Sequence, residues 1–224
     1  MLAYHRLGVS LAFCVGCLGL LCGPARADIK NWQTGQTIPG TEAITPGPGM
    51  YLSYWNTPAY NLRYGDFSGG LDLNCSNFHD SWFDNARFGQ ANLTGADFAY
   101  AKLTKADLTD AVVSKASFSF SNGFTKEQLY STASYKGEDL QGIRLEVDNL
   151  SGWNFAGQNL TGASLAGSTL ASANLSQANL TGANFNSATL TNVKLIDAVV
   201  TKANFASSPS FTKEQLYSTA NYKA

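Results

Sequence analysis

The chain has 224 residues, with 15 lysines and arginines against 16 aspartates and glutamates, so its formal net charge is −1. This near balance is ordinary for a soluble protein and gives no reason to expect nucleic acid as a partner. Only two histidines and four cysteines are present. They leave little material for a metal centre or for a catalytic base.

Residues 1–27 predict a secretory signal peptide. A short basic stretch precedes an apolar run over residues 7–21, and an Ala-Arg-Ala sequence follows it. The apolar run, at about 15 residues, is shorter than the roughly 20 that a membrane span needs. We therefore expect cleavage between Ala27 and Asp28, a secreted or periplasmic location, and no membrane anchor after cleavage.

Removal of this segment changes the charge and the cysteine content. Arg6 and Arg26 leave, so 13 basic residues remain against 16 acidic ones and the net charge becomes −3. Three of the four cysteines also leave. One of them, Cys17, follows the small Gly16, so lipid attachment at Cys17, as in a lipoprotein, is an alternative to the cleaved signal peptide. For Cys75 we expect an unreactive thiol, with an intermolecular disulfide as the alternative in an oxidising compartment.

Residues 28–59 are expected to form an N-terminal cap for the repeats that follow. The segment is rich in turn-forming proline and glycine, including the Pro-Gly-Pro-Gly run at 46–49. An open end of a β-structure invites edge-to-edge association, and a cap would cover it. An aromatic cluster at its end has a functional alternative, a sugar-binding platform. The cluster consists of Tyr51, Tyr54, Trp55, Tyr60 and Tyr64.

From Ala86 to Phe118 and again from Ala163 to Phe205 the chain repeats every five residues in the order small, polar, Leu or Phe, polar, polar, and weaker repeats begin at residue 60. Residues five apart are rotated by about 140° on an α-helix, and an odd spacing alternates faces on a strand. Neither element buries the large residues on one side, so the chain must turn after every repeat. The period predicts an all-β solenoid. Its expected core residues are Phe88, Leu93, Phe98, Leu103, Leu108, Leu165, Leu170, Leu175, Leu180 and Phe185.

The sequence Ala-Asn-Leu-Thr-Gly, at 91–95 and again at 178–182, resembles the motif of pentapeptide-repeat proteins. The resemblance implies a right-handed quadrilateral β-helix with four repeats in each coil. We expect this fold in two arrays, over residues 60–120 and 138–207.

The coil arrangement predicts which residues stack on one another, and the sequence contains one irregular repeat. Residues about 20 apart lie over one another at the inter-strand spacing of ~4.8 Å, so Leu160 should lie over Leu180. Six residues instead of five separate Phe67 from Leu73. This extra residue predicts a bulge at Gly69-Gly70.

A twelve-residue segment at 124–135 recurs almost unchanged at 211–222, an offset of 87 residues. Thr125 and Gln128 have the spacing of a helix capping box, and the second copy repeats it. We expect a linker helix of about two turns within residues 121–137 and a capping helix within residues 208–224. The linker sequence resembles that of secreted bacterial pentapeptide-repeat proteins.

No residue is assigned a catalytic, cofactor-binding or metal-binding role. His79 stands at an outward position, where we expect it to be solvated, and it has no recognisable ligand spacing to the nearby acidic residues. Asp97 and Asp107 also occupy outward positions and are expected to provide solubility. The abundant serines and threonines have no evident base to activate them.

The sequence therefore predicts a non-enzymatic exported scaffold that binds an unknown protein or cell-envelope partner. Two alternatives stay open. Some members of the family mimic DNA and protect DNA gyrase, which needs a strongly acidic surface, and the aromatic cluster could bind carbohydrate. At the C-terminal end, residues 213–218 either fold over the last coil or join two chains in a homodimer.

Overall fold

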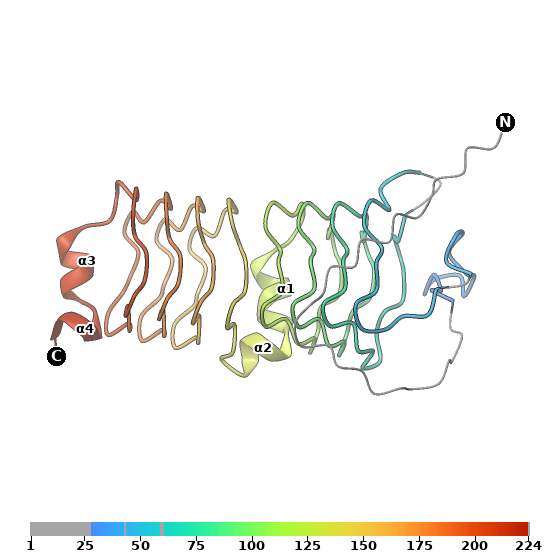
Figure 1. Cartoon of the computed structure of the whole chain (residues 1–224), viewed down its shortest axis with the longest axis horizontal. Coiled ribbons are helices and arrows are strands. Elements are labelled where there is room, and N and C mark those ends of the chain that lie inside the picture. The colour runs from blue at the N-terminus through green and yellow to red at the C-terminus, as the bar shows by residue number, and fades with distance from the viewer. Residues whose placement is uncertain (1–27, 43, 59–60, 224) are drawn as a thin grey trace.

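The computed structural model describes residues 28–42, 44–58 and 61–223. The predicted signal peptide and Ala27 lie outside these ranges. Figure 1 shows a rod of stacked coils, with one helix pair in the middle and another at the C-terminal end. None of the helices in the described ranges has the length and apolar character that a membrane span requires.

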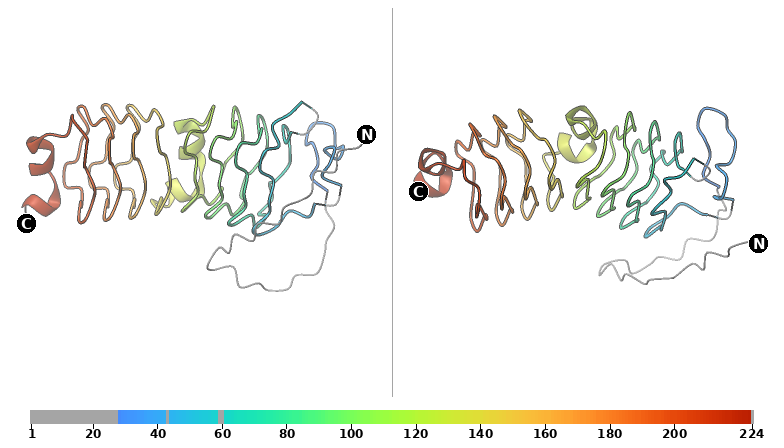
Figure 2. Two further views of the ribbon diagram at one scale, coloured as in Figure 1. Left: turned by 45° about the horizontal axis from the view of Figure 1, so that its top comes forward. Right: turned by 90° about the horizontal axis from the view of Figure 1, so that it is seen from above.

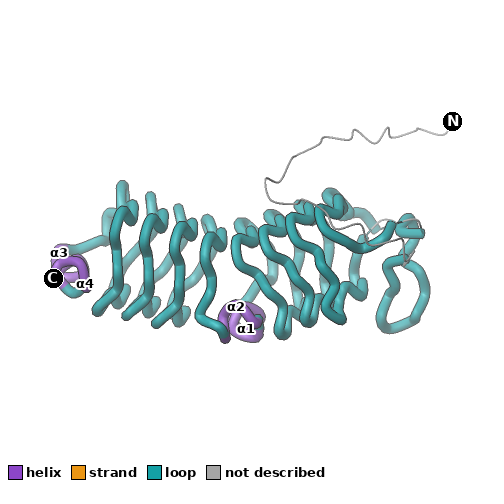
Figure 3. Tube along the Cα trace, turned by 60° about the horizontal axis from the view of Figure 1, so that its bottom comes forward, coloured by secondary structure: helices purple, strands orange, loops and turns teal. Residues whose placement is uncertain are grey.

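Each regular coil contains 20 residues and has four sides. Parallel bridges join backbone residues 20 apart, and successive bridges are five residues apart along the chain, so each repeat forms one side. Four such bridges of one coil are Asp72–Asn92, Asn77–Asp97, Trp82–Lys102 and Arg87–Asp107. Each bridge is a single residue pair, and the tube in Figure 3 accordingly shows the coils without extended strands.

A tight turn stands at every corner between two sides. The amide of the small residue donates to the carbonyl of the preceding large residue, as from Ala96 to Leu93 at 2.9 Å. The residue before the small one has a positive φ, which is 69° at Gly95. Glycine suits this conformation because it has no Cβ to clash.

The polar residue before each large residue stabilises the turn that follows. Asp97 Oδ1 accepts the amide of Ala99 at 2.9 Å, and Asp107 Oδ1 accepts that of Thr109 at the same distance. A short carboxylate or amide side chain is suited to this bond to its own backbone two residues on. The aspartates for which we expected a solubility role thus also form part of the turns.

The interior is filled by ladders of large apolar side chains. The ten residues named as core positions in the sequence analysis all have relative exposures of at most 1%. Aromatic rings stack from coil to coil, as in Phe98 on Phe118, whose centroids are 5.4 Å apart at an interplanar angle of 2°. The adjacent small positions are equally closed, since Ala91 and Ala178 are both 0% exposed.

The bulge predicted at Gly69-Gly70 is confirmed. Asp66 bridges to Arg87, a spacing of 21 residues instead of 20, while the next bridge along the chain has the regular spacing. Both glycines have positive φ, 79° and 77°. The extra residue is absorbed at this corner, and the repeats after it regain their register.

The N-terminal segment packs on the first coils. Ile29 and Ile38 are buried, with exposures of 1% and 5%. Asn31 forms an antiparallel bridge with Gly65, and Trp32 Nε1 donates to the carbonyl of Asn85 at 2.7 Å. These contacts attach residues 28–38 to the first coils.

Two short helices interrupt the coils in the middle of the rod. They are α1 (Lys126–Ser131) and α2 (Ala133–Lys136), and the capping box predicted at Thr125 is present. A single helix of about two turns was expected, but Thr132 ends α1 in an extended conformation and caps α2 through its side chain. Figure 2 shows the pair between the two sets of coils.

The two arrays nevertheless form one stack. On one side the ladder continues directly, from Ser117 to Arg144, at a spacing of 27 residues instead of 20. The helix pair takes up the additional residues. Large residues then occupy small-residue positions in the next coil, as at Trp153, which is 7% exposed and packs beside Phe124 with a centroid distance of 6.1 Å.

A second helix pair, α3 (Lys213–Tyr217) and α4 (Ala220–Lys223), lies on the last coil. Phe211 stacks on Phe205 with a centroid distance of 4.3 Å. Gln215 Nε2 donates to the carbonyls of Leu190 and Val193 at 2.7 and 3.1 Å. The segment expected to fold over the last coil therefore does contact it.

Candidate functional site

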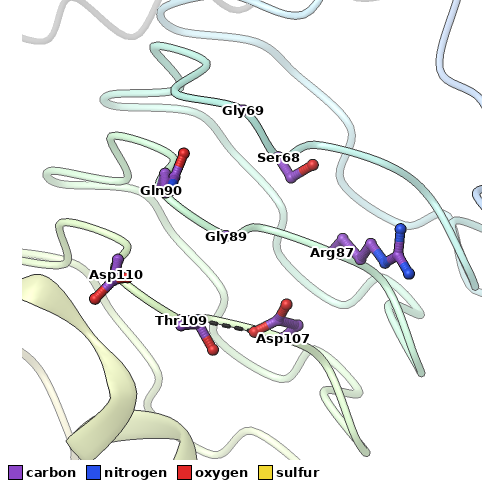
Figure 4. A pocket seen from close by; sticks show the side chains of 8 residues that line it. All are labelled: Ser68, Gly69, Arg87, Gly89, Gln90, Asp107, Thr109 and Asp110. Carbon is purple, nitrogen blue, oxygen red and sulfur yellow. Dashed lines mark hydrogen bonds between the residues drawn. The ribbon is translucent and has the colours of Figure 1, made fainter.

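A shallow polar depression crosses three successive coils of the first array. It is open to solvent and has a volume of about 420 Å³. Figure 4 shows the stacked corners that line it: Ser68, Gly69, Arg87, Gly89, Gln90, Asp107, Thr109 and Asp110.

Several charged groups that line the depression already have partners. The Arg87 guanidinium is already placed 3.8 Å from the centroid of the Trp32 ring. Asp107 uses one carboxylate oxygen in its turn. The lining of the depression contains neither a histidine nor a cysteine, and the Ser68 hydroxyl donates to the carboxylate of Asp66. Across the described part of the chain, no group of three or more histidines, cysteines or carboxylates is arranged to hold a metal ion.

One corner of the rod carries a row of aromatic side chains, which we call the aromatic row: Tyr54, His79, Tyr100 and Phe120. Ring centroids are 5.6 Å apart between Tyr54 and His79, 5.2 Å between His79 and Tyr100, and 4.8 Å between Tyr100 and Phe120. The four residues come from successive coils. The row therefore runs along the rod instead of around it.

Three members of the row combine a positive φ with an exposed apolar side chain. Tyr54, Tyr100 and Phe120 have φ values of 64°, 61° and 58°, a conformation that costs about 1–2 kcal/mol for a residue with a Cβ. The same side chains are 62%, 51% and 42% exposed. On the following coil Val147 repeats both features, with a φ of 61° and an exposure of 54%. The positive φ belongs to the corner turn that every repeat makes, as at Lys105 and Lys115. The turn does not require large apolar side chains, however, and their exposure on successive coils makes the row the best candidate for a binding surface.

His79 does not have the solvated environment that its outward position led us to expect. Its ring is half-buried between Tyr54 and Tyr100. Its Nδ1 atom is buried and forms no hydrogen bond with any described residue. The expectation was wrong because it considered each repeat alone, whereas the neighbours that cover the ring come from the coils on either side.

The aromatic cluster predicted at 51–64 does not form a single platform. Tyr54 joins the aromatic row, Tyr64 lies beside Trp32 at a centroid distance of 6.1 Å, and Trp55 is only partly exposed and packs against the core. Tyr51 is 60% exposed, and Tyr60 lies outside the described residues. Sugar rings stack on open aromatic faces, but Tyr100 and Phe120 cover each other's faces at an interplanar angle of 2°.

A titratable group is buried at the junction of the two arrays. Asp148 stands at a small-residue position, and its Oδ2 atom is buried without a partner among the described residues. Burial raises the pKa of this carboxyl to about 7, the Phe120 amide opposes the rise, and the negative charge of Glu146 adds to it. By contrast, the hydrogen bonds from Ser164 and Arg144 hold the pKa of Glu146 below its usual range against the effect of burial.

The sequence matches the family described as pentapeptide repeats in eight copies, over residues 72–110, 149–186 and 170–208. These matches fall on the regular coils of both arrays. No curated protein matches the chain.

Several solved structures are similar to this chain. HetL, a pentapeptide-repeat protein involved in heterocyst differentiation regulation in the cyanobacterium Nostoc, is 24% identical over 70% of this chain and 81% of its own, with a TM-score of 0.34. QnrB1, a plasmid-mediated fluoroquinolone resistance protein, is 18% identical over 75% of this chain and 91% of its own, with a TM-score of 0.33. The pentapeptide-repeat protein Rfr23 from the cyanobacterium Cyanothece is 20% identical over 70% of this chain and 84% of its own, with a TM-score of 0.22.

Proposed function

Since the chain is a pentapeptide-repeat protein, we propose that it is an exported, non-enzymatic scaffold that binds another protein of the cell envelope through its aromatic row. We also infer that its four-sided coils have the right-handed sense of the family's quadrilateral β-helix. Export rests on the signal-peptide pattern of residues 1–27. The partner role rests on the geometry of the row.

The observation that carries this proposal is the exposure of large apolar side chains at one corner of successive coils. A buried tyrosine or phenylalanine removes about 150–250 Å² from water. The exposed half of one such ring, roughly 100 Å², would contribute about 2.5 kcal/mol when a partner covers it. Three rings and Val147 on one line thus provide a continuous apolar contact of the kind found at the centre of protein interfaces.

The charge pattern of the coils does not favour DNA mimicry. On one side the bridged residues alternate in sign, from Asp66 through Arg87 to Asp107. On the next, Lys102 Nζ lies 4.0 Å from the centroid of the Trp82 ring. A DNA mimic requires continuous negative charge along such sides, because the phosphates that it imitates are evenly spaced.

A capture experiment tests the proposed role. The exported wild-type protein and the variant Tyr100→Ser/Phe120→Ser are purified from their native compartment after mild crosslinking. A matched control, Lys105→Ser/Lys115→Ser, changes two exposed residues that also have positive φ but lie outside the row. We expect the control to retain the captured partner and the row variant to lose it, with both variants folded by circular dichroism. Equal capture by all three proteins would contradict the proposal.

A further inference from the structure

The two helix pairs of this chain attach to their preceding coils in the same way. Gln128 Nε2 donates to the carbonyls of Leu103 and Ala106 at 2.8 Å each, just as Gln215 does to the last coil. The Ala133 amide donates to the Ala111 carbonyl at 2.9 Å, and the Ala220 amide donates to Ala198 at the same distance.

The ion pair and the tyrosine pair of each copy are also equivalent. Lys136 lies 2.7 Å from Asp110, and Lys223 lies 2.7 Å from Asp197. Tyr130 and Tyr135 stack with their centroids 4.3 Å apart, and the corresponding pair in α3 and α4 stacks at 4.2 Å. The two helix pairs are therefore one structural element used twice, and they present equivalent outer faces.

In the first copy the outer face holds the first coil of the second array. The Tyr130 hydroxyl accepts the amide of Asn154, and the Tyr135 hydroxyl donates to the Asn154 carbonyl at 2.8 Å. Trp153 lies against Tyr130 with a centroid distance of 6.4 Å. The two phenols thus satisfy both backbone groups of one residue in the docked coil. Leu129 of α1 is completely buried.

In the second copy no described residue covers this face. Leu216, the equivalent of Leu129, is 37% exposed, and Tyr217 and Tyr222 are 46% and 56% exposed. A terminal cap of a solenoid needs a polar outer face for solubility. This face is instead apolar, and its tyrosine pair is already arranged as in the occupied copy.

We propose that the outer face of α3 and α4 is a docking surface for the first coil of another pentapeptide array, of the kind that residues 138–158 form on α1 and α2. The occupant places a backbone amide and carbonyl on the hydroxyls of Tyr217 and Tyr222 and a large apolar side chain beside Tyr217. This binding mode is independent of the aromatic row.

A tandem chain tests the proposal directly. Residues 138–223 are repeated immediately after residue 224, which corresponds to Gly137 in the 87-residue register. We expect hydrogen exchange at the amides of residues 213–223 to slow by about tenfold or more relative to the original chain, to the level of residues 126–136. A gain of this size corresponds to about 1.4 kcal/mol.

The variant Tyr217→Phe provides the specific readout, and Tyr130→Phe is its matched control. In the original chain, Tyr130→Phe should lower the melting temperature and Tyr217→Phe should leave it unchanged. Among the described residues, the Tyr130 hydroxyl has a backbone partner and the Tyr217 hydroxyl has none. In the tandem chain both variants should lower it by similar amounts. Unchanged exchange in the tandem chain would overturn the proposal, as would a dimer of the original chain in which Leu216 is already protected by a second copy.

Discussion

Replacement of Asp148 by asparagine should remove a specific part of the pH dependence of stability. The carboxyl has a pKa of about 7 in the folded chain against an ordinary value of 3.8. A raised folded pKa means that the folded state binds more protons than the unfolded state between these values. The contribution of Asp148 to the free energy of unfolding is therefore fully present below about pH 4, falls as the pH rises, and is lost above about pH 7.

The magnitude follows from the size of the shift. Three pH units correspond to about 4 kcal/mol, and since the residue is only half-buried, solvent screening reduces this to roughly 2 kcal/mol. For a chain of this length, a difference of that size shifts the melting temperature by about 4–8 °C. Asparagine is similar in shape to the protonated acid and keeps an oxygen for the Phe120 amide.

Thermal unfolding of the wild type and Asp148→Asn at pH 4 and pH 8 measures the effect. The variant should nearly match the wild type at pH 4, where the contribution of the carboxyl is still present, and exceed its melting temperature at pH 8. Asp107→Asn, at an exposed turn, controls for the loss of one negative charge. If the wild type and Asp148→Asn keep the same difference at both pH values, the reasoning about this buried carboxyl is wrong.

Three further predictions concern the coils and the chain ends. Ala178→Leu should destabilise by about 1–3 kcal/mol because it overpacks a closed corner, whereas Asn179→Leu beside it should stay within about 0.5; equal losses of melting temperature would contradict the inward and outward assignment. Deletion from Phe211 onward should give soluble aggregates by light scattering, since it uncovers the last coil, and a monomer of unchanged melting temperature would show that the helix pair is dispensable. Mass spectrometry of the exported protein should find Asp28 at its N-terminus, and a chain that starts at Met1 in the cytoplasm would exclude export.

The solenoid and its turns could be predicted because the repeat carries them locally. The five-residue period requires a turn after every repeat, and the capping box at Thr125 lies within four consecutive residues. Local signals also located the bulge at Gly69-Gly70. Each of these features depends on neighbours in the sequence, so no knowledge of the coil stacking was needed.

The aromatic row was missed because its members are neighbours only between coils. Residues outside the regular repeats and the bulge lengthen the spacing from Tyr54 to His79. His79 stands one position before the corner residue Asp80, so it is 21 residues from Tyr100, whereas Tyr100 and Phe120 have the regular spacing of 20. The burial of Asp148 has a similar origin. Its position is that of a small residue in an ordinary coil, and in this coil, which follows the junction, the larger residues Ile143 and Trp153 also stand at such positions and are buried.

Photo-crosslinking from the aromatic row tests the central claim most directly. A photoreactive phenylalanine derivative at Tyr100 keeps an aromatic ring in the row, and the same group at Lys115 lies on another corner of the same array. In the exported protein we expect one discrete crosslinked partner from position 100 and none from position 115. No crosslink from position 100, or the same products from both positions, would contradict the assignment of the row as the partner-binding surface.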